Sequence, residues 1–456
     1  MKDIISKIGV ATVALASKYP AEQRNHINIL LSKFKDKNIG ISFVNEFIDT
    51  ITKASNANDY FKKENIDLLL LQIGSWIPDE LAVRVIEDIK VPLVLWVVPE
   101  TLNDGNISTG SVVGFMQSGG VISKLGKKFE ILFGGPEDEN VIKSLNSIIK
   151  AIKAIKELRN SRIGLLGYHC PGMLDAGFHE LELKNIIGPE IVYIDIAKLI
   201  DTFKKINTVS CKKFLNEINS KNFQIAGPTN DDLTEAVRLY LALKQIVEFN
   251  SLSGIAVRCW PELKELDIVS PCLALSMLTD EGIVASCEGD VLGAVSMQIL
   301  YYLSGQAPFF LDVLRLSIEE RIIFGFHCGA AATCLAENTS NVVLKTHFRG
   351  DKPADQRNWK PGVTAEFPVK PGRVTFARLD EMKGIYRMAT YGGEAQSTEM
   401  FTRGNNVKVK MDGNVQEIIN ALVVEGFGHH QVLAHGNIIK ELTILCKFLG
   451  IKCLEL

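Results

Sequence analysis

The stretch "IDLLLLQIGSWIPDELAVRVIEDIKVPLVLWVVPE", residues 66–100, decides the fold class of this chain. Its two ends, 66–76 and 91–100, are almost continuously apolar, which is typical of strands buried on both faces of a sheet. The stretch between them, 78–90, has a helix-like mixture of apolar and charged residues. Strand, helix and strand in this order predict a βαβ unit of a parallel sheet.

The same alternation extends over the first two thirds of the chain. Strands are predicted at 8–16 and 39–45, with a helix at 21–37 between them. Lys2 and Lys7 before residues 8–16 give this start some features of a short signal peptide, but Asp3 and the small apolar run favour an opening strand. A second α/β set begins near Arg162, after the helical stretch 144–161. It continues through strands at 161–169 and 253–260 and a long helix at 231–250.

The character of the sequence changes near residue 340. Short strands separated by glycine and charged turns follow, with no helices between them, at 342–348, 362–369, 372–380, 384–393 and 406–413. This pattern predicts an antiparallel barrel or sandwich, closed by one helix at 437–450. We therefore predict two Rossmann-like parallel-sheet α/β domains, 1–158 and 159–335, followed by a β-rich, barrel-like domain, 336–456. The central domain is expected to carry the site.

Composition excludes several classes of protein. The 456 residues are 46% hydrophobic and 23% charged with a formal net charge of -3, which gives no electrostatic footprint for nucleic acid. No apolar run is long enough to span a membrane, and neither GxGxxG after the first strand nor GxxxxGK[ST] is present to bind a nucleotide. The nine cysteines are scattered without a CxxC spacing, so we expect free thiols and a cytoplasmic location.

Polar residues follow apolar runs at three positions in the chain. In α/β proteins ligand sites form at such positions, at the carboxyl ends of the strands. These polar residues are Glu288 and Asp290 in "VASCEGDVLGAVSM", Asp312 in "FFLDVLRL", and His327 in "FGFHCGAA". Simpler explanations stay open: both aspartates could cap helices, and a lone histidine is often a satisfied core residue. The late "GFGHHQVLAHG" adds an adjacent histidine pair. Two carboxylates and an imidazole suit Mn²⁺, or Mg²⁺ or Co²⁺, and a cation held this way can act as a Lewis acid in aldose–ketose isomerisation through an enediol.

The C-terminal half resembles the L-fucose isomerase and L-arabinose isomerase family. The resemblance covers about residues 270–453 and rests on "CEGD", an aspartate 24 residues later in "FFLD", "FHCG", "GVTAEFPVKPGRVTFARL" and "GFGHHQVLAHGNI", in this order. It implies that Glu288 and Asp312 bind the metal and transfer the proton, and that His430 is the third metal ligand. The resemblance also implies that His327 is a metal ligand or lies next to the ligands. It further implies a homo-oligomer, a trimer or hexamer, with its site at a subunit boundary.

Departures from the family bear on the substrate. His429 stands where the fucose branch has asparagine, and Asn437 replaces a histidine of that branch. Candidates for substrate contact are His429, Arg258 in "VRCW" and His169 in "GYHCPGM"; Arg258 could instead lie on the surface over an aromatic ring, and His169 could belong to a turn. We predict a metal-dependent isomerase for an L-fucose-like or L-arabinose-like sugar or a sulfonated hexose such as sulfoquinovose. The alternative is a sugar-binding or regulatory protein without turnover.

Overall fold

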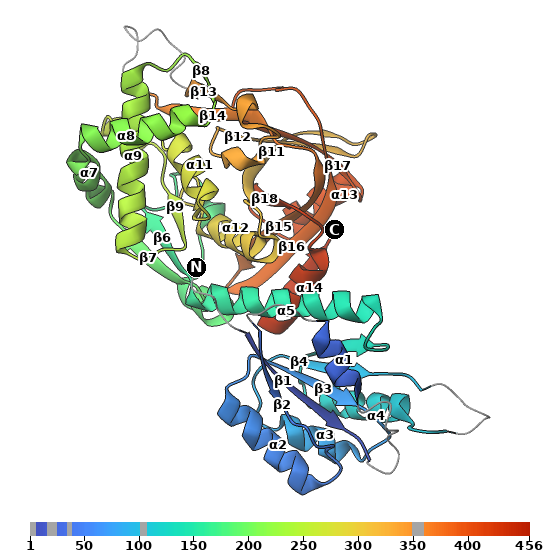
Figure 1. Ribbon diagram of the computed structural model, residues 1–456. Helices are drawn as coiled ribbons and strands as arrows, with labels where there is room; N and C mark the ends of the chain where they lie inside the picture. The colour runs from blue at the N-terminus through green and yellow to red at the C-terminus, as the bar shows by residue number, and fades with distance from the viewer. Residues whose placement is uncertain (1–5, 16–24, 34–38, 101–106, 349–359) are drawn as a thin grey trace. The chain divides into compact units, whose positions relative to one another are not determined.

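The computed structural model describes residues 6–15, 25–33, 39–100, 107–348 and 360–456. Its chain divides into two compact units, Met1–Ala154 and Ile155–Leu456, which are described separately (Figure 1). The division falls inside the helix Glu139–Asn160, close to the first predicted boundary. The second predicted boundary, at 335/336, stays a prediction.

Unit 1 is built on a five-stranded parallel sheet with strand order β2-β1-β3-β4-β5. The strands are β1 (Ser6–Val13), β2 (Ile39–Phe43), β3 (Leu68–Ile73), β4 (Leu93–Val97) and β5 (Phe129–Phe133), and the helices are α1 (His26–Ser32), α2 (Ile51–Glu64), α3 (Asp79–Ile86), α4 (Ser111–Lys124) and α5 (Glu139–Asn160). Every residue of β3 and β4 is buried, as the apolar runs predict for central strands. The opening strand is confirmed, whereas Ala16 and the ends of the helix expected at 21–37 lie outside the described residues.

Unit 2 begins with a four-stranded parallel sheet of order β10-β9-β6-β7. Its strands are β6 (Arg162–Leu166), β7 (Glu190–Ile194), β9 (Gly254–Val257) and β10 (Val284–Ser286). Its helices are α6 (Glu180–Glu182), α7 (Ile196–Lys205), α8 (Thr208–Ser220), α9 (Asn230–Phe249), α10 (Glu262–Glu265), α11 (Cys272–Asp280) and α12 (Val291–Ser304). In this sheet β7 lies on one side of β6, whereas β9 and β10, which come later in the chain, lie on its other side. In open α/β sheets a ligand site forms where the strand order reverses in this way, at the carboxyl ends of the strands.

The second sheet of unit 2 is mixed and ten-stranded, with order β19-β16-β15-β18-β11-β12-β17-β14-β13-β8. Its strands are β8 (Gln224–Ala226), β11 (Phe309–Ser317), β12 (Ile322–His327), β13 (Val343–Thr346), β14 (Val363–Pro368), β15 (Gly372–Met382), β16 (Ile385–Gln396), β17 (Asn405–Met411), β18 (His430–His435) and β19 (Lys452–Glu455). Because β16 also pairs with β17, the six strands β16, β15, β18, β11, β12 and β17 pair antiparallel in a closed ring. An α/β protein with a β-rich C-terminal part is thereby confirmed.

The structure corrects three details of the sequence prediction. Strands β8, β11 and β12 come from the stretch assigned to the central α/β domain but belong to the ten-stranded sheet. A helix that the strand pattern did not predict, α13 (Val415–Val424), lies between β17 and β18, and a last strand, β19, follows the closing helix α14 (Ile439–Leu449). Asp312 lies inside β11 and is therefore not a helix cap.

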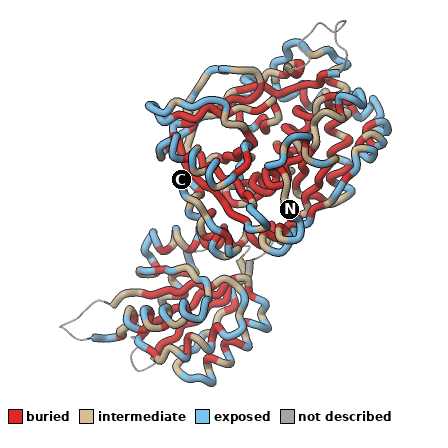
Figure 2. Tube along the Cα trace, turned by 180° about the vertical axis from the view of Figure 1, so that it is seen from behind, coloured by how far each residue is buried: buried red, intermediate tan, exposed pale blue. Residues whose placement is uncertain are grey.

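Helix α12 is buried almost all round, because it lies between the two sheets of unit 2 and contacts β9, β10, β15 and β18. Apolar and small residues cover its whole circumference, as expected for a helix without a solvent face. Figure 2 shows buried chain in the interior of each unit and exposed chain along outer helices and loops. Among the described residues no helix is long and apolar enough to cross a membrane, and all nine cysteines are free.

Candidate functional site

Glu288 lies in the short loop between β10 and α12, at the carboxyl end of the four-stranded sheet. Its backbone is left-handed, with φ of 63°, a conformation that costs a non-glycine residue about 1–3 kcal/mol and is kept only where the surroundings enforce it. The Cys170 N–H donates to the Glu288 carbonyl at 2.9 Å, and the Gly289 N–H donates to the Val257 carbonyl at 3.0 Å. A Cβ at Gly289 would lie 2.2 Å from the Tyr168 carbonyl oxygen, so only glycine fits there. The loop is held against its neighbours, which fixes where the carboxylate of Glu288 points.

Asp290 caps α12, which the sequence had left open as the simpler explanation of this residue, and it also contacts His430. Its side chain is completely buried and accepts a hydrogen bond of 2.7 Å from the Gly293 N–H. Arg378 donates to both of its carboxylate oxygens, at 2.6 and 3.3 Å, and His430 Nδ1 lies 2.9 Å from Oδ2. Burial alone would raise the pKa of Asp290, but the charge of Arg378 and the hydrogen bond to His430 outweigh burial and hold this pKa far below its usual range. Asp290 is therefore ionised and orients the imidazole of His430.

His430 is the first residue of β18 and is 1% exposed. Because Asp290 accepts from Nδ1, the other ring nitrogen, Nε2, is directed at Glu288 and lies 3.2 Å from Oε2. The ring of Phe310 packs beside the imidazole, with 4.4 Å between centroids. Burial lowers the pKa of His430, but the hydrogen bonds to Asp290 and Glu288 more than compensate and raise it to about 9.

Asp312 faces His430 across two antiparallel strands, since Asp312 of β11 is the direct partner of His430 of β18. Its Oδ1 lies 3.9 Å from His430 Nε2. This oxygen is buried and has no hydrogen-bond partner among the described residues, although the side chain as a whole is 37% exposed. The structure thus brings Glu288, Asp312 and His430 together around one imidazole nitrogen.

His327, the last residue of β12, lies behind this group. It is buried, its ring is 5.3 Å from that of Phe310 and 6.5 Å from that of His430, and burial lowers its pKa. Its Nδ1 is buried without a hydrogen bond to any described residue. His327 is therefore not the satisfied core histidine that the simpler explanation assumed.

His429 borders the group on its exposed side. Its Nδ1 lies 2.6 Å from Asp175 Oδ2, and its ring centroid is 3.9 Å from that of His430. Ligand atoms of Glu288, His429 and His430 all lie within 4.8 Å of one another. Asp175 could not be predicted as a neighbour of His429 from the sequence, because a single aspartate in a loop carries no pattern that identifies its partner.

Arg258 and His169 lie together at the carboxyl ends of β9 and β6. Arg258 forms an ion pair with Glu262, which balances its charge, so it is less suited to grip an anionic substrate than the sequence suggested. His169 packs on Tyr168 with 4.1 Å between ring centroids. Burial and the nearby Arg258 lower the pKa of His169.

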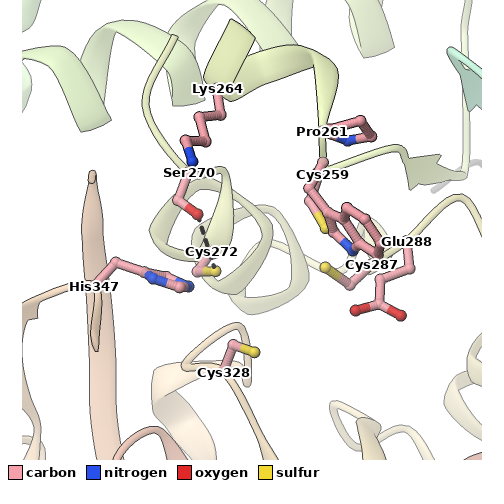
Figure 3. Close-up of a pocket in the computed structure, with 10 residues that line it drawn as sticks. Cys259, Pro261, Lys264, Ser270, Cys272, Cys287, Glu288, Cys328 and His347 are labelled. Carbon is pink, nitrogen blue, oxygen red and sulfur yellow. Dashed lines mark hydrogen bonds between the residues drawn. The ribbon is translucent and has the colours of Figure 1, made fainter. Parts of the chain in front are cut away.

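Two cavities border the group. One, of about 230 Å³, contains Glu288 in its wall, and its lining residues are Cys259, Trp260, Pro261, Lys264, Ser270, Cys272, Cys287, Glu288, Cys328 and His347 (Figure 3). The other, of about 640 Å³, is lined by Asp312 and His429 and by apolar side chains of β11 and α13. Glu288 and Asp312 therefore each form part of the wall of a cavity.

The donor set fits a divalent metal ion. Glu288, Asp312 and His430 offer two carboxylates and one imidazole, which are hard-to-borderline ligands suited to cations of the Mn²⁺ type. Oδ1 of Asp312 supports this interpretation, since it is buried, receives no hydrogen bond from any described residue, and has His430 Nε2 at 3.9 Å as the neighbour that would share a cation with it. His429 is placed to add a further nitrogen.

Both the matching family model and the relatives of this chain are sugar isomerases. Residues 325–455 match the family described as L-fucose isomerase, C-terminal domain. The chain is 28% identical to the sulfoquinovose isomerase of Alkalicoccus urumqiensis over 86% of both chains, and 26% identical to the sulfoquinovose isomerase of Priestia aryabhattai over 89% of both. A solved structure, the periplasmic solute binding protein of Actinobacillus succinogenes 130z with bound D-allose, is 13% identical with a TM-score of 0.19, covering 66% of this chain and 92% of that one. A TM-score this low carries no argument about fold or function.

Proposed function

We propose that this chain, which matches the L-fucose isomerase C-terminal family model over residues 325–455 and resembles sulfoquinovose isomerases, is a sugar aldose–ketose isomerase that works with a divalent metal ion and through an enediol intermediate. Glu288, Asp312 and His430 would hold the ion, for which Mn²⁺ is our first choice and Mg²⁺ or Co²⁺ the alternatives. When bound, the ion acts as a Lewis acid that polarises the carbonyl of the open-chain sugar.

The protein's own groups supply the proton transfers. Glu288 and Asp312 approach His430 Nε2 from two elements, Glu288 from the loop after β10 and Asp312 from β11. We propose that they flank the two reacting carbons of the sugar, one taking the proton from C2 while the other assists proton transfer between the oxygens. General acid–base catalysis of this kind contributes typically about 10²- to 10⁴-fold to the rate.

The observation that carries this proposal is the convergence of both carboxylates on His430 Nε2, at 3.2 and 3.9 Å. We expect protein treated with a chelator to form no ketose from a 6-sulfonated glucose, and added Mn²⁺ to restore ketose formation, followed by NMR. Full activity with less than one equivalent of metal per chain, measured by elemental analysis, would contradict the metal dependence.

The cavity beside Glu288 supports an anionic sugar as substrate. Figure 3 shows Lys264 and His347 on one side of the cavity and Glu288 on the opposite side. A sugar whose C1 and C2 lie at Glu288 would extend its far end toward the ammonium group of Lys264. The two relatives reported above are named sulfoquinovose isomerases. We therefore propose a hexose with a sulfonate at C6, such as sulfoquinovose, as the substrate.

Lys264→Met should raise the KM for the sulfonated sugar by about tenfold and leave the KM for L-fucose or L-arabinose, where either is converted, unchanged. A charge-assisted hydrogen bond contributes about 1.5–3 kcal/mol, and we take the lower end because Lys264 is exposed. Initial rates with each sugar measure this effect. Lys212→Met, an exposed lysine of α8, is the matched control. Equal KM values for the sulfonated sugar in wild type and Lys264→Met would exclude this role.

We propose further that the protein is a homo-oligomer, trimer or hexamer, in the cytoplasm. Exposed apolar side chains, including Leu314, Val423 and Val424, lie on β11 and α13, the elements that line the larger cavity next to Asp312 and His429. A second copy on this face would cover the open side of the site. The nine free cysteines support a reducing compartment. Light scattering measures the assembly, and a monomer at the working concentration would rule it out; cell fractionation tests the location.

A further inference from the structure

Two cysteines, Cys259 and Cys287, lie close to Glu288. Cys259 follows β9 and Cys287 follows β10, and because these strands are parallel neighbours, their carboxyl ends bring both thiols to the same edge of the sheet. The two Sγ atoms and a carboxylate oxygen of Glu288 all lie within 4.8 Å of one another. We call Cys259, Cys287 and Glu288 the thiol site.

The thiol site is accessible to a small ion. All three of its residues line the cavity of about 230 Å³, and Figure 3 shows the two sulfur atoms next to the Glu288 side chain. Cys272 and Cys328 line the same cavity, so several thiols surround the space an ion would enter. The mechanism proposed above uses none of these cysteines.

The ligand chemistry of the thiol site differs from that of the carboxylate–histidine group. Carboxylates with one imidazole suit Mn²⁺ or Mg²⁺, whereas thiolates select softer cations such as Zn²⁺ and Cd²⁺. Glu288 belongs to both sets, since its Oε2 lies 3.2 Å from His430 Nε2 and a carboxylate oxygen lies within 4.8 Å of both thiols. An ion in the thiol site would therefore compete for Glu288.

We propose that Cys259, Cys287 and Glu288 form an inhibitory site for a soft divalent cation of the Zn²⁺ or Cd²⁺ class. Binding forms two metal–sulfur bonds and one metal–oxygen bond, the two S–H protons pass to solvent, and no electron is transferred. The bound ion withdraws Glu288 from the carboxylate–histidine group. The inhibition rests on the proposed function, but the binding itself does not.

Cadmium binding to the full chain tests the site without reference to activity. We expect Cd²⁺ titration of wild type to produce the ultraviolet charge-transfer band of cadmium thiolate, and Cys259→Ser to weaken the tightest part of this binding by at least about 100-fold. The estimate is a lower bound, because even loss of a partner outside the metal's own ligands costs about 10- to 100-fold in affinity. Cys211→Ser, a buried cysteine of α8 outside the cavity, is the control and should titrate like wild type. Cys259→Ala serves in the same way if the serine variant does not fold.

The second arm measures inhibition by Cd²⁺ of the Mn²⁺-loaded protein, each variant relative to its own rate without Cd²⁺. We expect Cys259→Ser to need at least about 100-fold more Cd²⁺ than wild type for the same inhibition. A titration that is identical in Cys259→Ser and wild type overturns the site. A band that disappears in Cys259→Ser while Cd²⁺ inhibits both proteins equally overturns the inhibitory role. A protein that converts none of the sugars contradicts the proposed function, and the cadmium band still decides whether the thiol site exists.

Discussion

Glu288→Gln should abolish sugar isomerisation while leaving the fold intact. Glutamine keeps the size of the side chain and keeps an oxygen atom in place of one carboxylate oxygen of Glu288, whose Oε2 lies 3.2 Å from His430 Nε2. It can neither take up a proton at C2 nor offer a negative charge to a metal ion. The loss of acid–base catalysis alone predicts a fall in kcat of about 10²- to 10⁴-fold, and weaker metal binding adds to it. Ketose formation under saturating Mn²⁺ measures the effect.

The matched control for this variant is Glu319→Gln, at an exposed position between β11 and β12. It makes the same chemical change away from the site and should keep the wild-type rate. Circular dichroism and thermal unfolding of Glu288→Gln should match wild type, because the backbone hydrogen bonds that hold the loop do not involve the side chain. Near-full activity of Glu288→Gln would refute the assignment of Glu288.

Arg378→Met should destabilise the core of unit 2 by about 3–5 kcal/mol. Arg378 is 1% exposed, and it pairs with Asp290 at 2.6 Å and with Asp380 at 3.4 Å, both of which are buried. Removing one partner of a buried ion pair leaves uncompensated charge in the interior, which accounts for a cost of this size. Hydrogen exchange of the α12 amides, followed by mass spectrometry, should accelerate about 100-fold or more.

A surface ion pair provides the control for this substitution. Arg373 lies in β15, the strand that also holds Arg378, and it pairs with Asp412, which follows β17. Both side chains are substantially exposed. Such pairs contribute about 0–1 kcal/mol, so Arg373→Met should change exchange in α12 little. If Arg378→Met and Arg373→Met accelerated hydrogen exchange of the α12 amides equally, the claim that the buried ion pairs of Arg378 support His430 would be wrong.

The parallel sheets could be predicted from the sequence because their signal is local. The apolar runs at 66–76 and 91–100 are long, and their buried strands β3 and β4 need apolar residues on both faces. The ten-stranded sheet could be predicted only as a β-rich region. Its order depends on pairs such as Phe309 with Leu433, which lie far apart in the chain and carry no pattern that links them. The helix α13 did have a signal, since Asn414 caps it and Glu417 follows three residues later.

In the candidate site, too, residues with a local sequence signal could be predicted, and residues defined by long-range contacts could not. Glu288 and Asp312 could be singled out as carboxylates that follow apolar runs, and the family resemblance added His430; the structure brings the three side chains together. Arg378 and Asp175 were missed, because a buried arginine in a strand or a lone loop aspartate looks like many others in a sequence. Their roles depend on contacts with Asp290 and His429 that only the folded chain creates.

The most direct test of the proposed chemistry is proton exchange at C2. Mn²⁺-loaded protein is incubated in D₂O with a 6-sulfonated glucose, L-fucose, L-arabinose or D-arabinose, and deuterium at C2 and ketose formation are followed together by NMR. We predict that deuterium enters C2 of one of these sugars, most strongly the sulfonated one, and that a chelator abolishes both exchange and ketose formation. Ketose that forms without solvent deuterium, or exchange that continues without metal, would contradict a metal-dependent enediol mechanism.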